Sequence, residues 1–383
     1  MKQYLAGARV VLSDAVIEDA AVLIEDDRIV AVNPESGGQA RATELSGLTL
    51  MPGLVDLHCD AIEKEVEPRP GVHFPLSFAA QQADRRNALG GITTVFHALS
   101  FADAELGVRN PAMAADVVHA IRAAQPRALV DNRAHCRYEV TDSSAVAVLG
   151  ELMQQGAVHL LSFMDHTPGQ GHFKSVTAYR QFLCDNYATP VAEVDTLIER
   201  KREAGAGADA RIRELVAVAR DCDVALASHD DDHRERVAAM SALGVTISEF
   251  PMNLETAVAA RDAGMVTVFG APNALRNRSQ SGSMKALEAV AADVADCLCA
   301  DYAPATLLGA VFSVHLEHGL TLPAATALAT LHPARAAGLR DRGAIAPGQR
   351  ADLIAVDTDQ PHPSVEHLWR SGRHWIIGGA GRD

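Results

Sequence analysis

Residues 54–75 read LVDLHCDAIEKEVEPRPGVHFP, and this stretch decides the fold. An apolar run leads to His58 and Asp60, and the chain then breaks into charged residues and prolines around Arg69. Side chains two apart on a strand share a face, so His58 and Asp60 are predicted to point one way and Cys59 the other. An apolar strand that ends in two metal-type ligands is typical of a parallel barrel, whose functional residues collect at the carboxyl ends of the strands.

Seven further strand-like runs follow, separated by helical stretches. The helical stretches, such as 77–90 and 209–222, repeat apolar residues at spacings of three and four. This alternation predicts an α/β protein with a (β/α)8 barrel of the TIM type. A doubly wound open sheet is the rival fold, but the sequence lacks the glycine-rich phosphate turn that such a sheet usually has after its first strand. The eight predicted strands are 54–60, 91–99, 128–140, 158–166, 223–230, 244–250, 264–272 and 297–302.

Both ends of the chain are rich in short strand patterns. VLSDAVIEDAAVLIEDDRIVAV (11–32) alternates apolar stretches with aspartate-rich corners, and HLWRSGRHWII (367–377) is typical of a closing hairpin. We therefore predict a small β-sandwich domain made of residues 1–53 and 341–383, with the barrel inserted as residues 54–340.

Composition and charge exclude several classes of protein. The net charge of −15 argues against a general nucleic-acid binder, whose surface would be basic. The six cysteines form no CxxC pair, so neither a disulfide framework nor a zinc ribbon is indicated. No apolar run reaches the roughly 20 residues that span a bilayer, and the first residues lack a secretory signal pattern. We expect a cytoplasmic protein that binds neither nucleic acid nor a membrane.

Residues that ligate metals recur at the ends of the predicted strands. A single histidine there is more often structural, and Asp230 and Asp231 could simply cap the next helix. Several such residues facing one mouth favour a site for Zn²⁺, Mn²⁺ or Fe²⁺. Two ions bridged by Glu139 are predicted, with Asp301 holding the attacking water and accepting its proton. The predicted ligands are His58, Asp60, Glu139, His166, His229 and Asp301.

The same strand ends carry residues suited to binding anions. Arg69 lies between two prolines, and His135 and Arg137 share the face of Glu139 by the period of two. Arginine pairs with phosphate oxygens through two nitrogens, and loops after strands seven and eight often bind phosphate in barrels. Arg278 or Lys174 alone would be an ordinary loop residue, but the whole set favours an oxyanion-rich substrate. Further candidates in the loops after strands four and seven are Gln170, Asn273, Arg276 and Ser281.

Several motifs together resemble the amidohydrolase superfamily. They include HCDAIEKEVEPRPG, HCRYEV, LSFMDHTPGQ, LASHDD, GAPN and DRGAIAPGQRADL, and they extend over nearly the whole chain. Within the superfamily the chain is similar to the α-D-ribose 1-methylphosphonate 5-triphosphate diphosphatases of the carbon–phosphorus lyase pathway. The resemblance implies a metal-dependent hydrolase of acid anhydrides that releases pyrophosphate and leaves the 5-phosphate, in phosphonate catabolism. It also implies substrate contacts for Glu63 and Lys64 in the HxDxxEK motif.

One loop departs from the pattern of these diphosphatases. Residues 276–283 read RNRSQSGS where they typically have RGGSHSGN, so Gln280 replaces a histidine, Ser283 an asparagine, and Arg278 adds a charge. The exact phosphorylated sugar is therefore left open. The alternatives are another amidohydrolase, such as a deaminase or cyclic-amide hydrolase acting on a different anionic substrate, and a non-catalytic member that binds phosphorylated ligands. A homo-oligomer, most simply a dimer, is expected.

Overall fold

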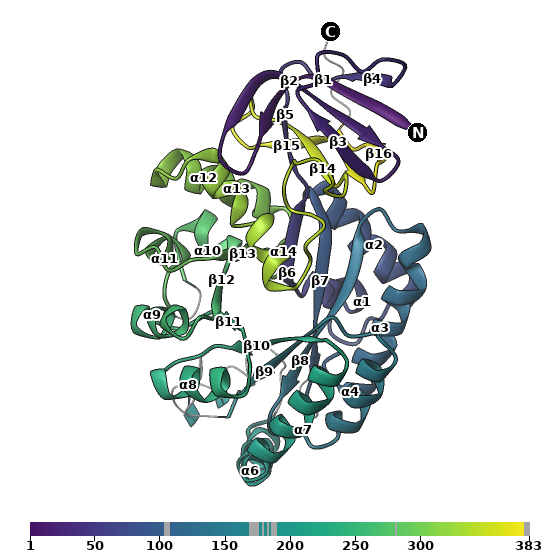
Figure 1. The fold of residues 1–383 in the computed structure, drawn as a ribbon. Helices are drawn as coiled ribbons and strands as arrows, with labels where there is room; N and C mark the ends of the chain where they lie inside the picture. Colours follow the sequence, from purple (N-terminus) through teal and green to yellow (C-terminus); the bar gives the residue numbers. More distant parts are fainter. Residues whose placement is uncertain are drawn as a thin grey trace.

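The computed structural model describes residues 1–102, 108–167, 176–177, 180–181, 184, 190–279 and 282–378, and its strands form two sheets. One sheet is a parallel barrel and the other is built from both ends of the chain (Figure 1). No helix in these described ranges is both long and apolar enough to cross a membrane.

The barrel strands are hydrogen-bonded in the order in which they follow along the chain, from β6 to β13. Seven of them lie within the predicted runs and β7 extends two residues beyond its run, so the predicted (β/α)8 barrel is confirmed. The barrel closes between β13 and β6 through a bridge that pairs Cys59 with Asp301. There the Asp301 amide donates a hydrogen bond to the carbonyl of His58 at 2.8 Å. The strands are β6 (Leu54–Cys59), β7 (Ile92–Phe101), β8 (Asp131–Glu139), β9 (Leu160–Met164), β10 (Ala225–His229), β11 (Ile247–Glu249), β12 (Val266–Gly270) and β13 (Cys297–Cys299).

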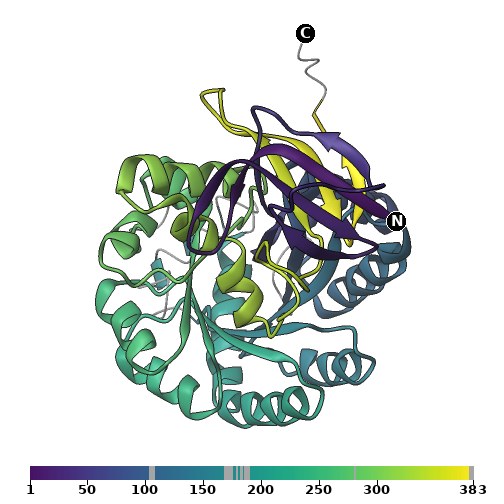
Figure 2. The same cartoon turned by 45° about the horizontal axis from the view of Figure 1, so that its top comes forward.

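Helices form the outer ring of the barrel (Figure 2). α7 illustrates why they do so: Ile212, Leu215, Val216 and Ala219 recur on one face and are buried, while the charged residues between them are not. The two predicted helical stretches correspond to α2 and α7. The described helices are α1 (Ala61–Val66), α2 (Leu76–Leu89), α3 (Pro111–Ala124), the 3₁₀ turn η1 (Gln125–Arg127), α4 (Ala145–Gln154), α6 (Val191–Gly205), α7 (Ala208–Asp221), α8 (Arg234–Ala242), α9 (Leu254–Asp262), α10 (Ala271–Arg276), α11 (Ala286–Ala291), α12 (Thr306–His318), α13 (Leu322–Ala327) and α14 (Leu331–Ala336).

The second sheet joins the two ends of the chain through the antiparallel pairing of β5 with β14. A second sheet from both termini was predicted and is confirmed, whereas the domain boundaries at residues 53 and 341 stay a prediction. Its own core includes Leu5, Ile24 and Trp369, which are completely buried. Its strands are β1 (Lys2–Val11), β2 (Val16–Glu25), β3 (Arg28–Val32), β4 (Arg41–Glu44), β5 (Thr49–Pro52), β14 (Leu353–Asp357), β15 (Ser364–Arg370) and β16 (Arg373–Ile376).

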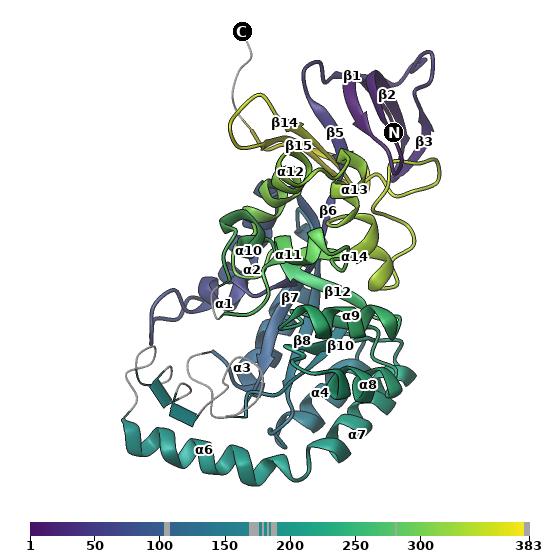
Figure 3. The same cartoon turned by 90° about the vertical axis from the view of Figure 1, so that its left-hand side faces the viewer.

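The terminal sheet meets the amino ends of the barrel strands. Asp131, the first residue of β8, accepts a 2.6 Å hydrogen bond from buried Arg342, which also donates to Thr94. Burial opposes ionisation of Asp131, but Arg133, Arg342 and Arg350 outweigh it and hold the pKa of this carboxyl well below its usual range. In Figures 1 and 3 the terminal sheet and α6 lie at opposite ends of the molecule. The carboxyl ends of the barrel strands are therefore left for the site.

Candidate metal centre and active site

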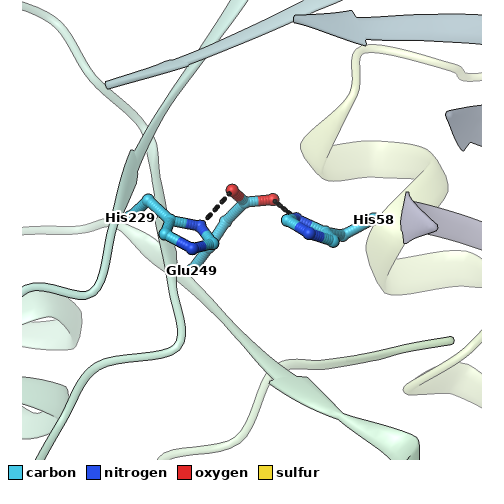
Figure 4. Close-up of side chains that lie close together, drawn as sticks. All are labelled: His58, His229 and Glu249. Carbon is cyan, nitrogen blue, oxygen red and sulfur yellow. Dashed lines mark hydrogen bonds and ion pairs between the residues drawn. The ribbon is translucent and has the colours of Figure 1, made fainter. Parts of the chain in front are cut away.

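Three buried side chains meet at the carboxyl ends of β6, β10 and β11 (Figure 4). The two oxygens of Glu249 lie 3.1 Å from Nδ1 of His58 and 3.3 Å from Nδ1 of His229. Glu249 is completely buried, and His58 and His229 are 1% and 8% exposed. Because parallel strands end at the same side of a barrel, residues far apart in the sequence converge here.

His135 on β8 lies next to this trio. Its Nε2 is 3.7 Å from Glu249 and 2.7 Å from the hydroxyl of Ser162, and its Nδ1 is 3.1 Å from the carbonyl of Leu57. Complete burial lowers the pKa of His135 to about 3, so the ring is neutral near pH 7. Both ring nitrogens are engaged inside the barrel, and the predicted contact of His135 with substrate stays a prediction.

The electrostatics of the trio favour an ionised carboxylate among imidazoles. Burial would raise the pKa of Glu249, but His135, His58 and His229 outweigh it and hold that pKa well below its usual range. Burial would likewise lower the pKa of His58, yet Glu249 raises it overall, whereas burial dominates at His229 and lowers its pKa. A buried carboxylate surrounded by imidazole nitrogens is a donor set that suits a divalent cation.

Two groups of candidate ligands are found among the described residues. In the first group, His58, His229 and Glu249 each offer one ligand atom, and these three atoms lie within 4.8 Å of one another. The second group, His166, His229 and Asp230, meets the same distance limit. The residues present therefore fit a divalent metal. The sequence predicted three members of these groups as ligands, namely His58, His166 and His229.

Glu139, the predicted bridging ligand, lies beside the second group. Its carboxylate is 3.2 Å from Nδ1 of His166 and accepts the backbone amide of that residue and the hydroxyl of Thr141. Lys201 of α6 approaches the same carboxylate at 3.9 Å although its side chain is only 5% exposed. The structure thus brings Glu139 and His166 together and adds a buried cation that the sequence did not indicate.

Asp60 and Asp301 lie where β13 returns to β6. The Asp60 amide donates to the carbonyl of Asp301 at 3.0 Å. Burial, reinforced by the charge of Asp60, raises the pKa of Asp301 to about 6. A carboxyl group with such a pKa can exchange a proton near neutral pH, which is what a general base requires.

The backbone is unusual within two residues of the ends of three of these strands. Asp230, Phe250 and Asp301 have φ values of +56°, +54° and +55°, in the left-handed region that costs most for a bulky residue. The ring of Phe250 packs edge-on against His58 and His229, with centroids 5.0 and 5.3 Å away. Backbone strain of this kind is concentrated at functional sites, where surrounding contacts hold it.

Charged side chains from a helix, a loop and a strand gather next to Asp60. Glu63 of α1 binds Nε and Nη2 of Arg109, both at 2.9 Å. Nη2 of Arg137 lies 3.9 Å from Asp60 and 3.8 Å from Glu63. Among the described residues, Nε and Nη2 of this buried arginine have no hydrogen-bond partner.

The remaining predicted substrate residues are more dispersed. Lys64 is exposed, and exposed Arg69 begins a tight turn in which Val72 bonds back to its carbonyl. Arg276 reaches the hydroxyl of Tyr302, while the amide of Asn273 holds the backbone of Met284 and Ala286. Gln170 and Ser281, together with the substituted Gln280, lie outside the described residues. These substrate contacts stay predictions.

Sequence reasoning missed Glu249, Arg109 and Lys201. Glu249 could have been found, because it ends a predicted strand just as His229 does. Arg109 and Lys201 reach the site from a loop and a helix, and no periodic pattern marks them.

Comparison with known proteins agrees with this geometry. The model of the amidohydrolase family matches residues 49–379. The chain is 34% identical over 370 residues to α-D-ribose 1-methylphosphonate 5-triphosphate diphosphatase of Escherichia coli (strain K12), covering 95% of this chain and 98% of that protein. It is 28% identical to an imidazolonepropionase of Deinococcus deserti, covering 89% and 86% of the two chains.

Solved structures support the fold. N-acetyl-D-glucosamine-6-phosphate deacetylase from Mycobacterium smegmatis superposes with a TM-score of 0.63 at 18% identity, covering 98% of this chain and all of that one. The barrel, the terminal sheet and the family match lead to one conclusion: the chain belongs to the amidohydrolase family.

Proposed function

We propose that the protein hydrolyses α-D-ribose 1-methylphosphonate 5-triphosphate to the 5-phosphate and pyrophosphate. The similarity to the Escherichia coli diphosphatase over 95% of the chain supports this substrate. The structural observation that carries the proposal is the position of buried Arg137, whose guanidinium faces Asp60 and Glu63 beside the histidine–carboxylate cluster. A neutral amide substrate would not require such a buried cation.

The metal would be held by the six predicted ligands together with Asp230 and Glu249. His58, His229 and Glu249 form one group, and His166 with Asp230 and Glu139 lies next to it, an arrangement that suits two ions. A divalent metal bound here supplies positive charge for the phosphate oxygens and lowers the pKa of a coordinated water.

Asp301 is the proposed proton acceptor. The oxygen of water attacks the α-phosphorus of the triphosphate, and its proton passes to the carboxylate of Asp301. The bond from this phosphorus to the oxygen that bridges to the β-phosphorus breaks, and its electron pair leaves with pyrophosphate. The raised pKa of Asp301, about 6, is matched to a proton transfer near neutral pH.

Arg137 is proposed to bind phosphate or phosphonate oxygens from within the barrel. Within the described residues its buried Nε and Nη2 have no hydrogen-bond partner, and an oxyanion would satisfy them through charge-assisted hydrogen bonds. Lys64, Arg69, Asn273 and Arg276 remain proposed contacts for the outer parts of the substrate.

A pyrophosphate-release assay on the ribose triphosphate tests the proposal, with metal content measured on the same protein. Release should require bound metal and should stop after chelation. The imidazolonepropionase match favours a second candidate, hydrolysis of a cyclic amide, and imidazolone propionate is the comparison substrate. Turnover of the cyclic amide without pyrophosphate release from the triphosphate would reject the diphosphatase proposal and leave the metal-dependent hydrolase.

A further inference from the structure

Asp231 is a completely buried carboxylate to which the proposed function gives no role. It follows the end of β10 by two residues. Its Oδ2 accepts hydrogen bonds from the hydroxyls of Ser228 on β10 and Ser248 on β11, the latter at 2.6 Å. One carboxylate oxygen therefore joins two neighbouring strands. Hydrogen bonds to a charged group are roughly twice as strong as those between neutral groups, so this junction is a strong one.

The two serines lie directly before two candidate metal ligands. Ser228 precedes His229 and Ser248 precedes Glu249, and in the parallel ladder the serines pair with each other, as do the two ligands. Side chains alternate between the faces of a strand. His229 and Glu249 meet His58 inside the barrel (Figure 4), so the serines face outward. Asp231 therefore holds the two strands from the outside, at the position where their ligands converge inside.

The backbone after β10 is bound to β11 as well. The amide of Asp230 donates to the carbonyl of Glu249, and the amide of Met252 donates to the carbonyl of Asp231, both at 2.9 Å. The φ of +56° at Asp230 marks a sharp turn between the strand and Asp231. The main chain and the carboxylate together fix the ends of β10 and β11 relative to each other.

The other oxygen of Asp231 faces an arginine. Oδ1 lies 3.6 Å from Nε of Arg236 on α8, whose side chain is 13% exposed, and it has no hydrogen-bond partner among the described residues. A buried carboxylate is costly unless an opposite charge accompanies it, and Arg236 supplies that charge. The orientation of the carboxylate is therefore fixed from two sides, by Arg236 and by the two serines.

We propose that Asp231 is a positioning residue of the metal centre. Through Ser228 and Ser248 it fixes the separation and orientation of His229 and Glu249, so that both ligands are in place before a cation binds. Nδ1 of His229 lies 3.3 Å from the carboxylate of Glu249. Ligands that are already ordered lose less freedom on binding, and partners that orient metal ligands contribute about 10- to 100-fold to metal affinity. The inference rests on the metal centre of the proposed function and not on its substrate.

The test compares Asp231 with a matched buried carboxylate at the opposite end of the barrel. Asp84 of α2 is 5% exposed and accepts hydrogen bonds from residues at and just before the amino end of β8. Metal-free wild type, Asp231→Ala, Asp231→Asn, Ser228→Ala, Ser248→Ala and Asp84→Ala are titrated with Co²⁺ in competition with a chelating dye. Thermal unfolding midpoints are measured without metal, so that loss of stability is separated from loss of binding.

Co²⁺ affinity should fall about 10- to 100-fold in Asp231→Ala, which loses both hydroxyl contacts. Ser228→Ala and Ser248→Ala should each give a smaller loss, since one of the two contacts is kept. Asp231→Asn should also lose less than Asp231→Ala, because its amide oxygen can accept both hydroxyls. Asp84→Ala should lower the unfolding midpoint but bind Co²⁺ as wild type does.

Two further measurements separate positioning from a merely structural role. The visible absorption bands of bound Co²⁺ depend on its coordination geometry. At saturating Co²⁺ the spectrum of Asp231→Ala should therefore differ from that of wild type, whereas the spectrum of Asp84→Ala should not. Ser248→Ala should cause no further loss of affinity once Asp231 is alanine, because the two residues act through the same hydrogen bond.

Wild-type Co²⁺ affinity and spectrum in Asp231→Ala and in both serine variants would overturn the inference, as would a wild type that binds no Co²⁺. Should Asp231→Ala fail to fold, the two serine variants decide the question, because each keeps the carboxylate and removes one hydroxyl. Absence of pyrophosphate release by the metal-loaded wild type would reject the proposed substrate, and the Co²⁺ titration would still decide the role of Asp231.

Discussion

Replacement of Glu249 by glutamine should remove metal from the protein while leaving the barrel folded. Glutamine has the shape of glutamate but lacks the charge, and its amide nitrogen cannot serve as a metal ligand. The carboxylate now lies 3.1 and 3.3 Å from the imidazoles of His58 and His229. The amide oxygen can still accept a hydrogen bond from one of them, so the packing at the end of β11 should survive.

The expected loss of metal affinity is about a hundredfold or more. Losing a partner that merely orients a metal ligand costs 10- to 100-fold, and Glu249 is proposed to bind the metal itself. A hundredfold change corresponds to about 2.8 kcal/mol of binding free energy. Complete burial of Glu249 means that a water is poorly placed to substitute for the missing ligand.

Competition with a chelating dye of known affinity measures this change, and circular dichroism checks the fold. Asp131→Asn is the matched control, because Asp131 is also a carboxylate of low exposure but lies at the other end of β8 with Arg342. Breaking that ion pair should lower the free energy of unfolding by about 3 kcal/mol without changing metal affinity. Wild-type metal affinity in Glu249→Gln would refute the assignment of Glu249 as a ligand.

Three further predictions concern the proton acceptor Asp301, the stability of the protein at acid pH, and Cys59 on β6, the first strand of the barrel. Asp301→Asn should lower turnover by about 10²- to 10⁴-fold in a steady-state pyrophosphate assay, and near wild-type turnover would remove Asp301 from the mechanism. Burial and Arg133 lower the pKa of His159 to about 4, below its unfolded value near 6.5, so only the unfolded chain takes up this proton between those pH values. The free energy of unfolding should therefore fall as pH is lowered from 6.5 to 4. In urea titrations, His159→Gln should show a shallower fall, and its slope should differ from that of wild type by at most about 1.4 kcal/mol per pH unit. His362→Gln, which replaces an exposed histidine, should match wild type. Cys59→Ser should keep its metal in elemental analysis, because Cys59 packs in the buried apolar cluster around β6, and loss of metal there would contradict the predicted facing of the strand.

The barrel was predictable because its strands are buried on both faces and read as continuous apolar runs. Their ends were less predictable. β11 and β13 contain three residues each, although the corresponding predicted runs are longer. In both cases the chain leaves the ladder at the site, where Phe250 and Asp301 adopt positive φ. The sequence gives no sign of this change at Phe250, because phenylalanine rarely adopts a positive φ, whereas Asp301 is of a residue type that tolerates it.

The candidate ligands divide in the same way. His58 and His229 could be proposed from strand ends alone, whereas the role of Glu249 depends on its contact with a histidine 191 positions away. Such a contact follows from the closure of the barrel, which sets strand β11 opposite β6, and no local pattern encodes it. Once a barrel is predicted, every polar residue at the carboxyl end of a strand should be considered a candidate for the same site.

The arginines expose the limit of that rule. The period of two predicted that Arg137 faces the barrel interior with Glu139, and its low exposure agrees with this. Arg109 and Lys201 lie outside the strands, and their long side chains bring a charge several ångströms from the backbone that carries it. The position of the charged group depends on the carboxylate that it contacts, Glu63 for Arg109 and Glu139 for Lys201. The fold must bring each pair together before the contact exists. Metal ligands on strands can therefore be proposed from spacing, whereas charged residues that reach the site from loops and helices require the assembled structure.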